Sequence, residues 1–322
     1  MKVLFISSGN SHYGVVPFIR NQGESLREAG IDLDFFTVVG KGVKGYLGNI
    51  RRLRKVIREN KYDVLHAHYS LIGLVALLTF SGKPIVLSVM GSDAYGDYDT
   101  KGRRIPSSYL YMMVTQLIQP FVKGIIVKSE NINKYIYRKK ITETIPNGVN
   151  FSRFSPRDKK ECRKKLGLPL ERKLVLFLAK PDDPRKNFKL LLDAEKLIDS
   201  KDFEVLNPYP IDNRDFPDYL NACDVFVLTS YNEGSPNVIK EAMACNIPII
   251  STPVGDVVEV LGDTPGCYLV GFDPEDVADK LKKALQFNKK TTGRVTIKDL
   301  DDRIVSQKII NIYKRVTNSK DH

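Results

Sequence analysis

The feature that most constrains the fold is an alternation of short apolar runs with longer amphipathic stretches, which continues along most of the chain. The amphipathic stretches, for example Val15–Ala29 and Ile50–Asn60, have the apolar spacing of helices that cover a sheet. Strands that alternate with helices in sequence predict an α/β protein, in which parallel sheets carry helices on both faces. The expected strands are Lys2–Ser7, Asp32–Val39, Tyr62–Ala67, Pro84–Val89, Gly124–Lys128, Thr142–Pro146, Lys173–Ala179, Phe203–Leu206, Asp224–Thr229, Pro248–Ser251 and Tyr268–Val270.

The length of the chain predicts two domains. Its 322 residues are 42% apolar, which is enough for two hydrophobic cores of ordinary size. The strand pattern pauses between Asn147 and Pro156, so we expect an N-terminal domain at 1–150 and a C-terminal domain at 151–300. Segment 301–322 is expected to form an amphipathic helix, because apolar residues recur there at helical spacing: Val305, Ile309, Ile312 and Val316.

One segment of the second half, ACDVFVLTSYNEGSPNVIKEAMACNIPIISTP, holds Glu233 and Glu241 eight residues apart at a predicted junction between a strand and a helix. Ser235 and Pro236 have the pattern of a helix N-cap followed by proline at the first helical position. The N-terminus of such a helix offers backbone N–H groups and the positive end of the helix dipole to a phosphate. The segment therefore predicts a carboxylate, a phosphate seat and a second carboxylate in succession.

Two glutamates at this spacing also occur as solvated surface residues, and the neighbouring sequence has to decide between the two interpretations. An apolar strand precedes the turn, small residues such as Ala242 and Ala244 lie in the helix predicted at Val238–Cys245, and a second apolar strand follows Pro248. These parts form one coherent strand–turn–helix–strand unit, which favours a binding site.

Several classes of protein are disfavoured by composition. No window approaches the roughly 20 apolar residues of a membrane span, and Leu71–Phe80 is expected to be a buried helix. The chain opens directly into a strand, without the layout of a signal peptide. The cysteines lack metal-ligand spacing, so we expect a cytosolic protein with reduced thiols at Cys162, Cys223, Cys245 and Cys267.

The net charge of +12 is concentrated in the first half of the chain. Up to Arg153 there are 22 basic and 11 acidic residues, whereas the remainder has 28 and 27. This asymmetry fits either a solvated surface or attraction to an anionic partner, such as a membrane that carries a lipid-linked acceptor. No nucleic-acid-binding motif accompanies the charge, so nucleic acid is not an expected partner. Basic clusters lie at Arg51–Lys55, Lys101–Arg104 and Arg138–Lys140.

Taken together, these segments resemble the retaining glycosyltransferases of family 4, whose donor domain carries a Glu-x7-Glu motif like that of Glu233 and Glu241. The resemblance extends over nearly the whole chain and includes Met1–Ser8 followed by Gly14, Tyr62–His68, Met90–Asp93, Ile145–Phe154 and Lys186-Asn187. It implies a GT-B architecture, in which two Rossmann-like, doubly wound domains face a central cleft. The N-terminal domain would bind the acceptor, the C-terminal domain the sugar nucleotide, and the last helix would cross back to the first domain.

The reaction that the resemblance implies is transfer of a sugar from a nucleotide diphosphate sugar to a hydroxyl. Negative charge then develops on the departing phosphate, and fixed positive groups stabilise it. By the same resemblance, Lys186 would contact this phosphate, Glu233 the hydroxyls of the sugar and Glu241 those of the ribose. The family usually has an arginine at the position of Lys180, so either Lys180 or Arg185 is expected to share this task. The remaining donor contacts implied are Gly14, Gly234, Ser235, Pro236, Asn237 and Val238.

In the N-terminal domain, the resemblance draws attention to two histidines and an aspartate. His66 and His68 flank one residue at the end of a predicted strand, so their side chains share a face. Each could be a structural residue or face a ligand, and His68 is the preferred catalytic candidate. The family often has a histidine at the position of Met90, which leaves Asp93 as the other polar candidate. The first glycine loop also departs from the pattern, with Tyr13 beside Gly14.

A metal ion is not expected, although Asp32–Asp34 and Asp97–Asp99 both read Asp-x-Asp. The alternatives that stay open are a catalytically silent sugar-nucleotide-binding protein and a GT-B epimerase or phosphorylase. The missing histidine at Met90 favours the silent binder. A dinucleotide dehydrogenase is disfavoured, because no Gly-x-Gly-x-x-Gly follows the first strand.

Overall fold

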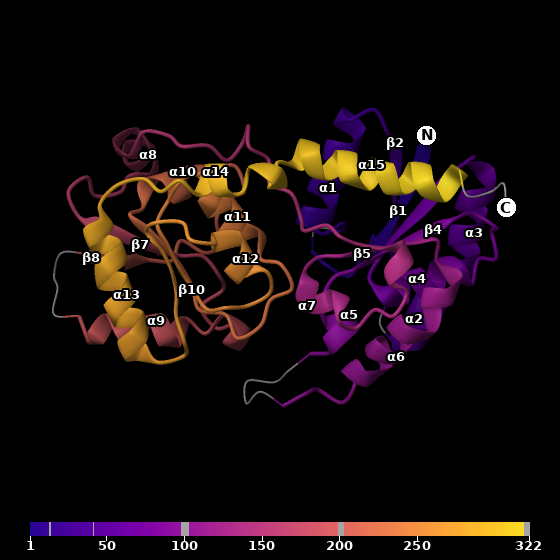
Figure 1. The fold of residues 1–322 in the computed structure, drawn as a ribbon, viewed down its shortest axis with the longest axis horizontal. Coiled ribbons are helices and arrows are strands. Elements are labelled where there is room, and N and C mark those ends of the chain that lie inside the picture. The colour runs from indigo at the N-terminus through magenta and orange to yellow at the C-terminus, as the bar shows by residue number, and fades with distance from the viewer. Residues whose placement is uncertain (13, 41, 98–102, 199–202, 319–322) are drawn as a thin grey trace. The chain divides into compact units, whose positions relative to one another are not determined.

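The computed structural model describes residues 1–322 except 13, 41, 98–102, 199–202 and 319–322. The chain divides into two compact units, and Figure 1 labels their elements. Unit 1 comprises Met1–Gly148 and Asp302–His322, and unit 2 comprises Val149–Asp301. Among the described residues, no helix combines the length and the apolar character needed to span a bilayer.

Unit 1 is built on a sheet of six parallel strands in the order β2-β1-β3-β4-β5-β6. The strands are β1 (Lys2–Ser8), β2 (Asp32–Val38), β3 (Val64–His68), β4 (Ile85–Val89), β5 (Gly124–Val127) and β6 (Thr142–Thr144). The α-helices are α1 (Pro17–Glu28), α2 (Gly42–Leu47), α3 (Ile50–Glu59), α4 (Ser70–Leu77), α5 (Ser92–Tyr95), α6 (Ser108–Ile118), α7 (Glu130–Asn133) and α15 (Asp302–Asn318).

Unit 2 repeats the design with five parallel strands in the order β11-β10-β9-β7-β8. The strands are β7 (Lys173–Phe177), β8 (Phe203–Leu206), β9 (Val225–Leu228), β10 (Ile249–Ser251) and β11 (Cys267–Leu269). The α-helices are α8 (Lys159–Leu166), α9 (Phe188–Lys196), α10 (Phe216–Ala222), α11 (Asn237–Ala244), α12 (Val257–Leu261), α13 (Pro274–Phe287) and α14 (Gly293–Thr296). Every predicted strand is present, and the α/β prediction is confirmed.

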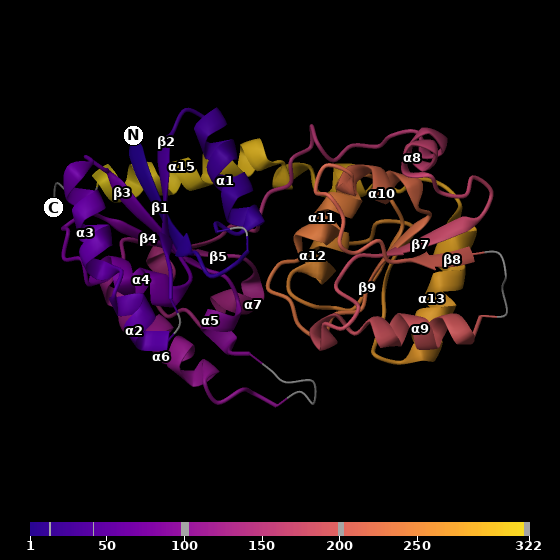
Figure 2. The same cartoon turned by 180° about the vertical axis from the view of Figure 1, so that it is seen from behind.

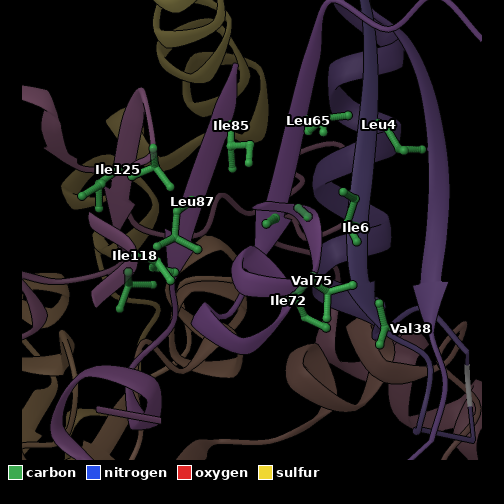
Figure 3. Close-up of a cluster of buried hydrophobic side chains, with 14 of the residues drawn as sticks. Leu4, Ile6, Val38, Leu65, Ile72, Val75, Ile85, Leu87, Ile118 and Ile125 are labelled. Atoms are coloured by element: carbon green, nitrogen blue, oxygen red, sulfur yellow. The ribbon is translucent and has the colours of Figure 1, made fainter. Parts of the chain in front are cut away.

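Each sheet has a hydrophobic core on both faces, as expected when helices cover a parallel sheet. In unit 1, Leu4, Leu65 and Leu87 of three adjacent strands belong to the same buried cluster as Ile72 of α4, and Figure 3 labels all four. The opposite face packs against α1 and α15. In unit 2, one core lies under α10, α11 and α12, and the other lies under α9 and α13.

The last helix, α15, is an integral part of unit 1. It packs against α1, and Figures 1 and 2 both show the two helices as neighbours at a steep angle. Its apolar face is buried against the sheet, where Tyr313 is fully enclosed, and Ser306 Oγ lies 2.7 Å from Ser25 Oγ on α1. The chain therefore leaves unit 1 after Gly148 and returns to it at Asp302.

Candidate active site

The strand order of unit 2 brings together the loops that carry the donor-binding residues predicted in the second half of the chain. In a parallel sheet, ligands bind at the carboxyl ends of the strands where the strand order reverses, because the following loops diverge there. In unit 2 this position lies between β7 and β9. The loop after β7 carries Lys180, Arg185 and Lys186, and the loop after β9 carries Glu233.

An ion pair joins these two loops. Lys186 Nζ donates a hydrogen bond to Glu233 Oε1 at 2.5 Å, and Ser230 Oγ donates to the same oxygen at 3.0 Å. Both side chains keep part of their surface in solvent, with exposed fractions of 25% for Lys186 and 20% for Glu233. The pair is therefore fixed in place but still accessible to a ligand.

The backbone of the loop after β7 is held by the start of the loop after β9. Thr229 Oγ1 donates to the carbonyl oxygens of Lys186 and Asn187, at 3.0 and 2.9 Å. The N–H of Tyr231 donates to the carbonyl of Arg185 at 2.9 Å. Asn187 has a φ of 50°, which allows the chain to turn from the short 3₁₀ helix Pro184–Lys186 into α9. These bonds set the position of Lys186 independently of its own side chain.

The N-cap of the helix after Glu233 lies one residue later than predicted. Helix α11 starts at Asn237, so Pro236 lies in the cap position and Ser235 precedes it. Prediction of Ser235 as the N-cap is therefore wrong. Its hydroxyl donates instead to Asp256 Oδ2 at 2.8 Å. Since the side chain of Pro236 has no acceptor, none at the cap position competes with a ligand for the N–H groups of the first turn, which includes Val238.

A buried ion pair, which the sequence analysis did not predict, explains the orientation of the Ser235 side chain. Lys240, on α11, is fully buried and lies 2.8 Å from Asp256 Oδ2, and it also donates to Ser235 Oγ. The other oxygen of Asp256 is buried without a hydrogen-bond partner in the described part of the chain. A lysine within the otherwise apolar face of a short helix was the available signal, because a buried ammonium needs a nearby carboxylate.

The turn at Gly234 is also packed closely against the loop after β10. A Cβ atom at Gly255 would lie 2.7 Å from the carbonyl oxygen of Gly234, and Gly255 has a φ of +60°. Any larger residue at position 255 would displace the turn. This contact and the Lys240–Asp256 pair hold the loop between Glu233 and α11 from two sides.

Glu241 lies on α11, one turn after the helix start, and its carboxylate differs from that of Glu233. It is half-buried, and none of the described residues provides it with a hydrogen bond or an ion pair. Burial raises the pKa of Glu241 to about 7, against the opposing charges of Arg153 and Lys240. Its oxygens are therefore available to accept hydrogen bonds from a ligand.

The two other basic candidates of this loop are exposed and paired with acids close in sequence. Lys180 Nζ lies 3.0 Å from Asp182 Oδ2, and Arg185 lies 2.9 Å from Asp183 Oδ2. Exposed pairs of this kind are weak, so either side chain can exchange its partner for a phosphate at little cost. The assignment of both to the donor stays a prediction.

In unit 1, the strand order reverses between β1 and β3, so the Gly14 loop and His68 lie at the corresponding position. Gly14 has a φ of +64°, which favours glycine, and a Cβ there would meet no atom within 4 Å. Its neighbour Tyr13 lies outside the described residues.

The two histidines of β3 are stacked, with ring centroids 4.4 Å apart, yet their surroundings differ. His66 is paired at both nitrogens, with Tyr313 Oη at 2.6 Å and Ser88 Oγ at 2.8 Å. Both nitrogens of His68 are buried without a partner in the described chain. Burial, with the nearby charges of His66 and Lys128, holds the pKa of His68 well below its usual value, so the ring is neutral. Of the two, only His68 has hydrogen-bonding capacity for a ligand.

The carboxylate of Asp93, in contrast to His68, already accepts hydrogen bonds at both oxygens. Its Oδ1 accepts from the N–H groups of Met90 and Gly91 at 2.9 and 3.0 Å, and its Oδ2 accepts from the N–H and hydroxyl of Ser70, both at 3.1 Å. Burial raises the pKa of this carboxyl, and these four bonds oppose the shift. The geometry suits a residue that holds the turn after β4, and a catalytic role for Asp93 stays a prediction.

The described residues contain no cluster of three or more His, Cys, Asp or Glu side chains that could hold a metal ion. Of the two Asp-x-Asp sequences, Asp32 and Asp34 lie on β2, where both approach Lys2 Nζ, at 3.8 and 3.4 Å. Asp99 of the second lies outside the described residues, as do Lys101 and part of its basic cluster.

Two family models match the chain. The model described as Glycosyltransferase Family 4 matches residues 13–153, and the one described as Glycosyl transferases group 1 matches residues 200–286. The first range falls almost wholly in unit 1 and the second in unit 2.

Among curated proteins, a Bacillus subtilis protein named as a teichuronic acid biosynthesis glycosyltransferase is 29% identical over 227 residues, which cover 62% of this chain. The chain spans 55% of the length of that relative. An Escherichia coli UDP-Gal:α-D-GlcNAc-diphosphoundecaprenol α-1,3-galactosyltransferase is 26% identical over 307 residues, covering 84% of this chain and 77% of the relative.

Solved structures share the fold at lower identity. A sucrose-phosphate synthase from Thermosynechococcus elongatus matches with a TM-score of 0.79 and 19% identity, covering 99% of this chain and 100% of its own. The Anabaena protein HepE in complex with UDP matches with a TM-score of 0.76 and 16% identity, covering 98% and 100%. The family models, the relatives and the two doubly wound units agree, so the chain belongs to glycosyltransferase family 4 and has the GT-B fold.

Proposed function

We propose that the chain is a retaining hexosyltransferase, which transfers a sugar from a nucleotide diphosphate sugar to a hydroxyl of a glycan or lipid-linked acceptor. The observation that carries the proposal is the succession of groups along one element of unit 2. Glu233, paired with Lys186, lies on the loop just before α11. The N-terminus of α11 follows, and Glu241 lies one turn further along the helix. A sugar, its diphosphate and the attached ribose need hydrogen-bonding groups in this order.

The phosphate is the most demanding part of such a donor. When the bond between the anomeric carbon and the β-phosphate oxygen breaks, negative charge develops on that oxygen. The ammonium of Lys186 and the N–H groups at the start of α11 supply fixed positive charge for it. Lys180 and Arg185 add exposed charge nearby. These groups provide the stabilisation without a metal ion, and the proposal includes none.

The two glutamates are suited to different hydroxyls. Glu233 is held through its Oε1 by Lys186 and Ser230, and its carboxylate can also accept hydrogen bonds from donor-sugar hydroxyls. Glu241 accepts no hydrogen bond from the described residues, which suits a carboxylate that binds the vicinal hydroxyls of a ribose. Neither residue has to act as a covalent nucleophile.

In the proposed reaction, the acceptor oxygen attacks the anomeric carbon on the face that the phosphate leaves. The acceptor proton passes to the departing phosphate oxygen, so configuration is retained without an enzyme-bound intermediate. His68, neutral and without a partner in the described chain, is the group of unit 1 that we assign to the acceptor hydroxyl. Asp93 would act indirectly, by holding the turn after β4.

The named relatives support a surface glycan or glycolipid as the product. One is named for teichuronic acid biosynthesis, and another for transfer of galactose from UDP-galactose to a sugar on diphosphoundecaprenol. The fold neighbour HepE was solved with UDP. A UDP-sugar donor and a lipid-linked acceptor are therefore the first combination to test.

The test is a screen of UDP-, GDP-, ADP- and dTDP-sugars for binding by titration calorimetry and for hydrolysis or transfer. With the active donor, Lys186→Ala is expected to lower kcat by about 10²–10³-fold, because a fixed donor to the leaving group is lost. Glu233→Ala is expected to reduce kcat comparably. Lys189→Ala is the matched control, since Lys189 is an exposed lysine nearby that pairs with Asp193.

Two results would contradict the proposal. Tight binding of a sugar nucleotide without hydrolysis or transfer would indicate the catalytically silent binder. Turnover that survives both Lys186→Ala and Glu233→Ala would place the chemistry elsewhere in the molecule.

A further inference from the structure

Helix α6 of unit 1 presents a row of large apolar side chains to solvent. Its residues Tyr109, Met113 and Leu117 are 56%, 53% and 61% exposed, and Phe121, in the 3₁₀ turn that follows, is 61% exposed. These residues recur every four positions, so they form one stripe along the helix, about 18 Å long at 1.5 Å per residue. Leu110, 41% exposed, widens it. We call these five residues the α6 stripe.

The stripe is not a poorly packed core. The opposite side of α6 is already buried against α4 and α5, through residues such as Val114 and Ile118. Figures 1 and 2 show α6 outside these helices, at the periphery of unit 1. A helix with one buried face needs only that face for folding. A second, contiguous apolar face on the outside of a protein marks an interaction surface.

The chain around the stripe is strongly basic. Between Arg103 and Lys140 there are eight lysines and arginines and one acid, Glu130, and α6 itself carries no charge. The exposed lysines of this stretch include Lys134, Lys139 and Lys140.

Direct contacts place two arginines at the ends of the stripe. The guanidinium of Arg104 lies 5.5 Å from the ring centroid of Tyr109. At the other end, Arg138 donates to the carbonyls of Gln119 and Pro120 at 3.2 and 3.1 Å. Tyr137 Oη donates to the carbonyl of Gln116 at 3.2 Å, so the segment that carries Arg138 lies beside α6.

We propose that the α6 stripe docks unit 1 on an anionic lipid bilayer, lying in the interface without crossing it. Apolar side chains enter the boundary between headgroups and acyl chains, while the lysines and arginines beside them attract anionic headgroups. Tyrosines such as Tyr109 and Tyr137 suit this layer, because a ring with one polar end is favoured at the boundary of membrane and water. An apolar stripe beside basic residues matches an anionic bilayer, in which negative headgroups lie directly above apolar acyl chains. The inference rests on the surface of unit 1 and not on the proposed transfer reaction.

The experiment is co-sedimentation of the full chain with vesicles, in the absence of donor and acceptor. Vesicles of phosphatidylcholine alone are compared with vesicles that also contain phosphatidylglycerol. Wild type is expected to bind the anionic vesicles only. Lys134→Gln, Lys139→Gln and Lys140→Gln together should weaken binding on the order of 100-fold, at about fivefold for each lysine. Met113→Ser, Leu117→Ser and Phe121→Ser together should abolish it.

Matched controls distinguish binding through the α6 stripe from non-specific electrostatic or hydrophobic binding. Arg51→Gln, Lys55→Gln and Arg58→Gln remove the same charge from the exposed side of α3 and should leave binding within a fewfold of wild type. Leu197→Ser removes an exposed leucine of unit 2, also without effect. Far-UV circular dichroism confirms that each variant is folded.

The inference is overturned if neither vesicle binds, if both bind equally, or if the α3 variant loses as much affinity as the lysine variant. It is also overturned if the serine variant still binds, or if the stripe instead holds two copies of the chain together in size-exclusion chromatography with light scattering. Transfer to a water-soluble acceptor is measured in parallel. Its failure with intact vesicle binding counts against the proposed function alone.

Discussion

The turn after β4 in unit 1 and the turn after β9 in unit 2 both follow the carboxyl end of a parallel strand but use their carboxylates differently. In unit 1, Asp93 accepts four hydrogen bonds, two from N–H groups of the turn and two from Ser70 at the start of α4. In unit 2, Glu233 turns aside to Lys186 and leaves the start of α11 without a side-chain cap at Pro236. The first turn has its N–H groups bonded by its own carboxylate. The second turn is held by residues of other segments, and its carboxylate does not cap the helix that follows.

The difference separates stability from ligand binding within one fold. A carboxylate that satisfies buried N–H groups stabilises the protein, because those groups would otherwise be unpaired. A carboxylate on a loop that neighbouring residues already hold adds little to folding and remains available for a substrate. The contrast predicts that substitutions in the two turns change different properties.

The largest expected effect is that of Asp93→Ala. It leaves the N–H groups of Met90, Gly91 and Ser70 buried without an acceptor, so the free energy of unfolding of unit 1 should fall by about 3–5 kcal/mol. Glu233→Ala should lower it by less than about 1 kcal/mol, since that pair is partly exposed. Urea denaturation followed by circular dichroism measures both. A stable Asp93→Ala variant with no transferase activity would break the comparison.

A second, smaller effect concerns pH and Glu241. An unfolded glutamate has a pKa of about 4.3, whereas burial raises the pKa of folded Glu241 to about 7. Between these values the folded state holds a proton that the unfolded state has lost. The free energy of unfolding should therefore fall as pH rises through this window, by up to about 3 kcal/mol, and level off above pH 7.

Glu241→Gln should remove that slope, because glutamine does not titrate. The same ionisation should help donor binding, since a carboxylate can accept from both hydroxyls of a ribose. Donor KM is thus expected to fall between pH 6 and 8 in wild type and to stay flat in the variant. Denaturation curves and KM values at several pH values test the two halves separately. Identical pH profiles for wild type and variant would show that Glu241 does not titrate there.

The smallest effect sharpens the contrast between the two histidines of β3. Tyr313→Phe removes the partner of His66 Nδ1 and should cost about 1 kcal/mol of stability, without changing kcat. Tyr137→Phe is the control, because its hydroxyl is on the exposed side of α6. If Tyr313→Phe lowered kcat tenfold with unchanged stability, then His66 rather than His68 would be the histidine that serves the reaction.

The elements of the fold could be predicted because their signals are local. Strands such as Phe203–Leu206 are short apolar runs, and α15 is evident from apolar residues at helical spacing. The Glu233–Glu241 spacing is equally local, since both residues lie within one strand–turn–helix segment. The cap position was misassigned because Ser235-Pro236 is a good N-cap sequence, and the competing partner, Asp256, lies 21 residues away.

The sequence by itself determined two α/β domains, the order of their strands along the chain and the segment that carries the paired glutamates. Only the tertiary structure decided which polar groups are satisfied. Lys186 meets Glu233 across 47 residues and His66 meets Tyr313 across 247, whereas His68 and Glu241 find no such partner in the described chain. Hydrophobic periodicity is a local pattern that can be read from neighbouring residues. A hydrogen bond between distant residues depends on atoms that only the folded backbone brings within about 3 Å.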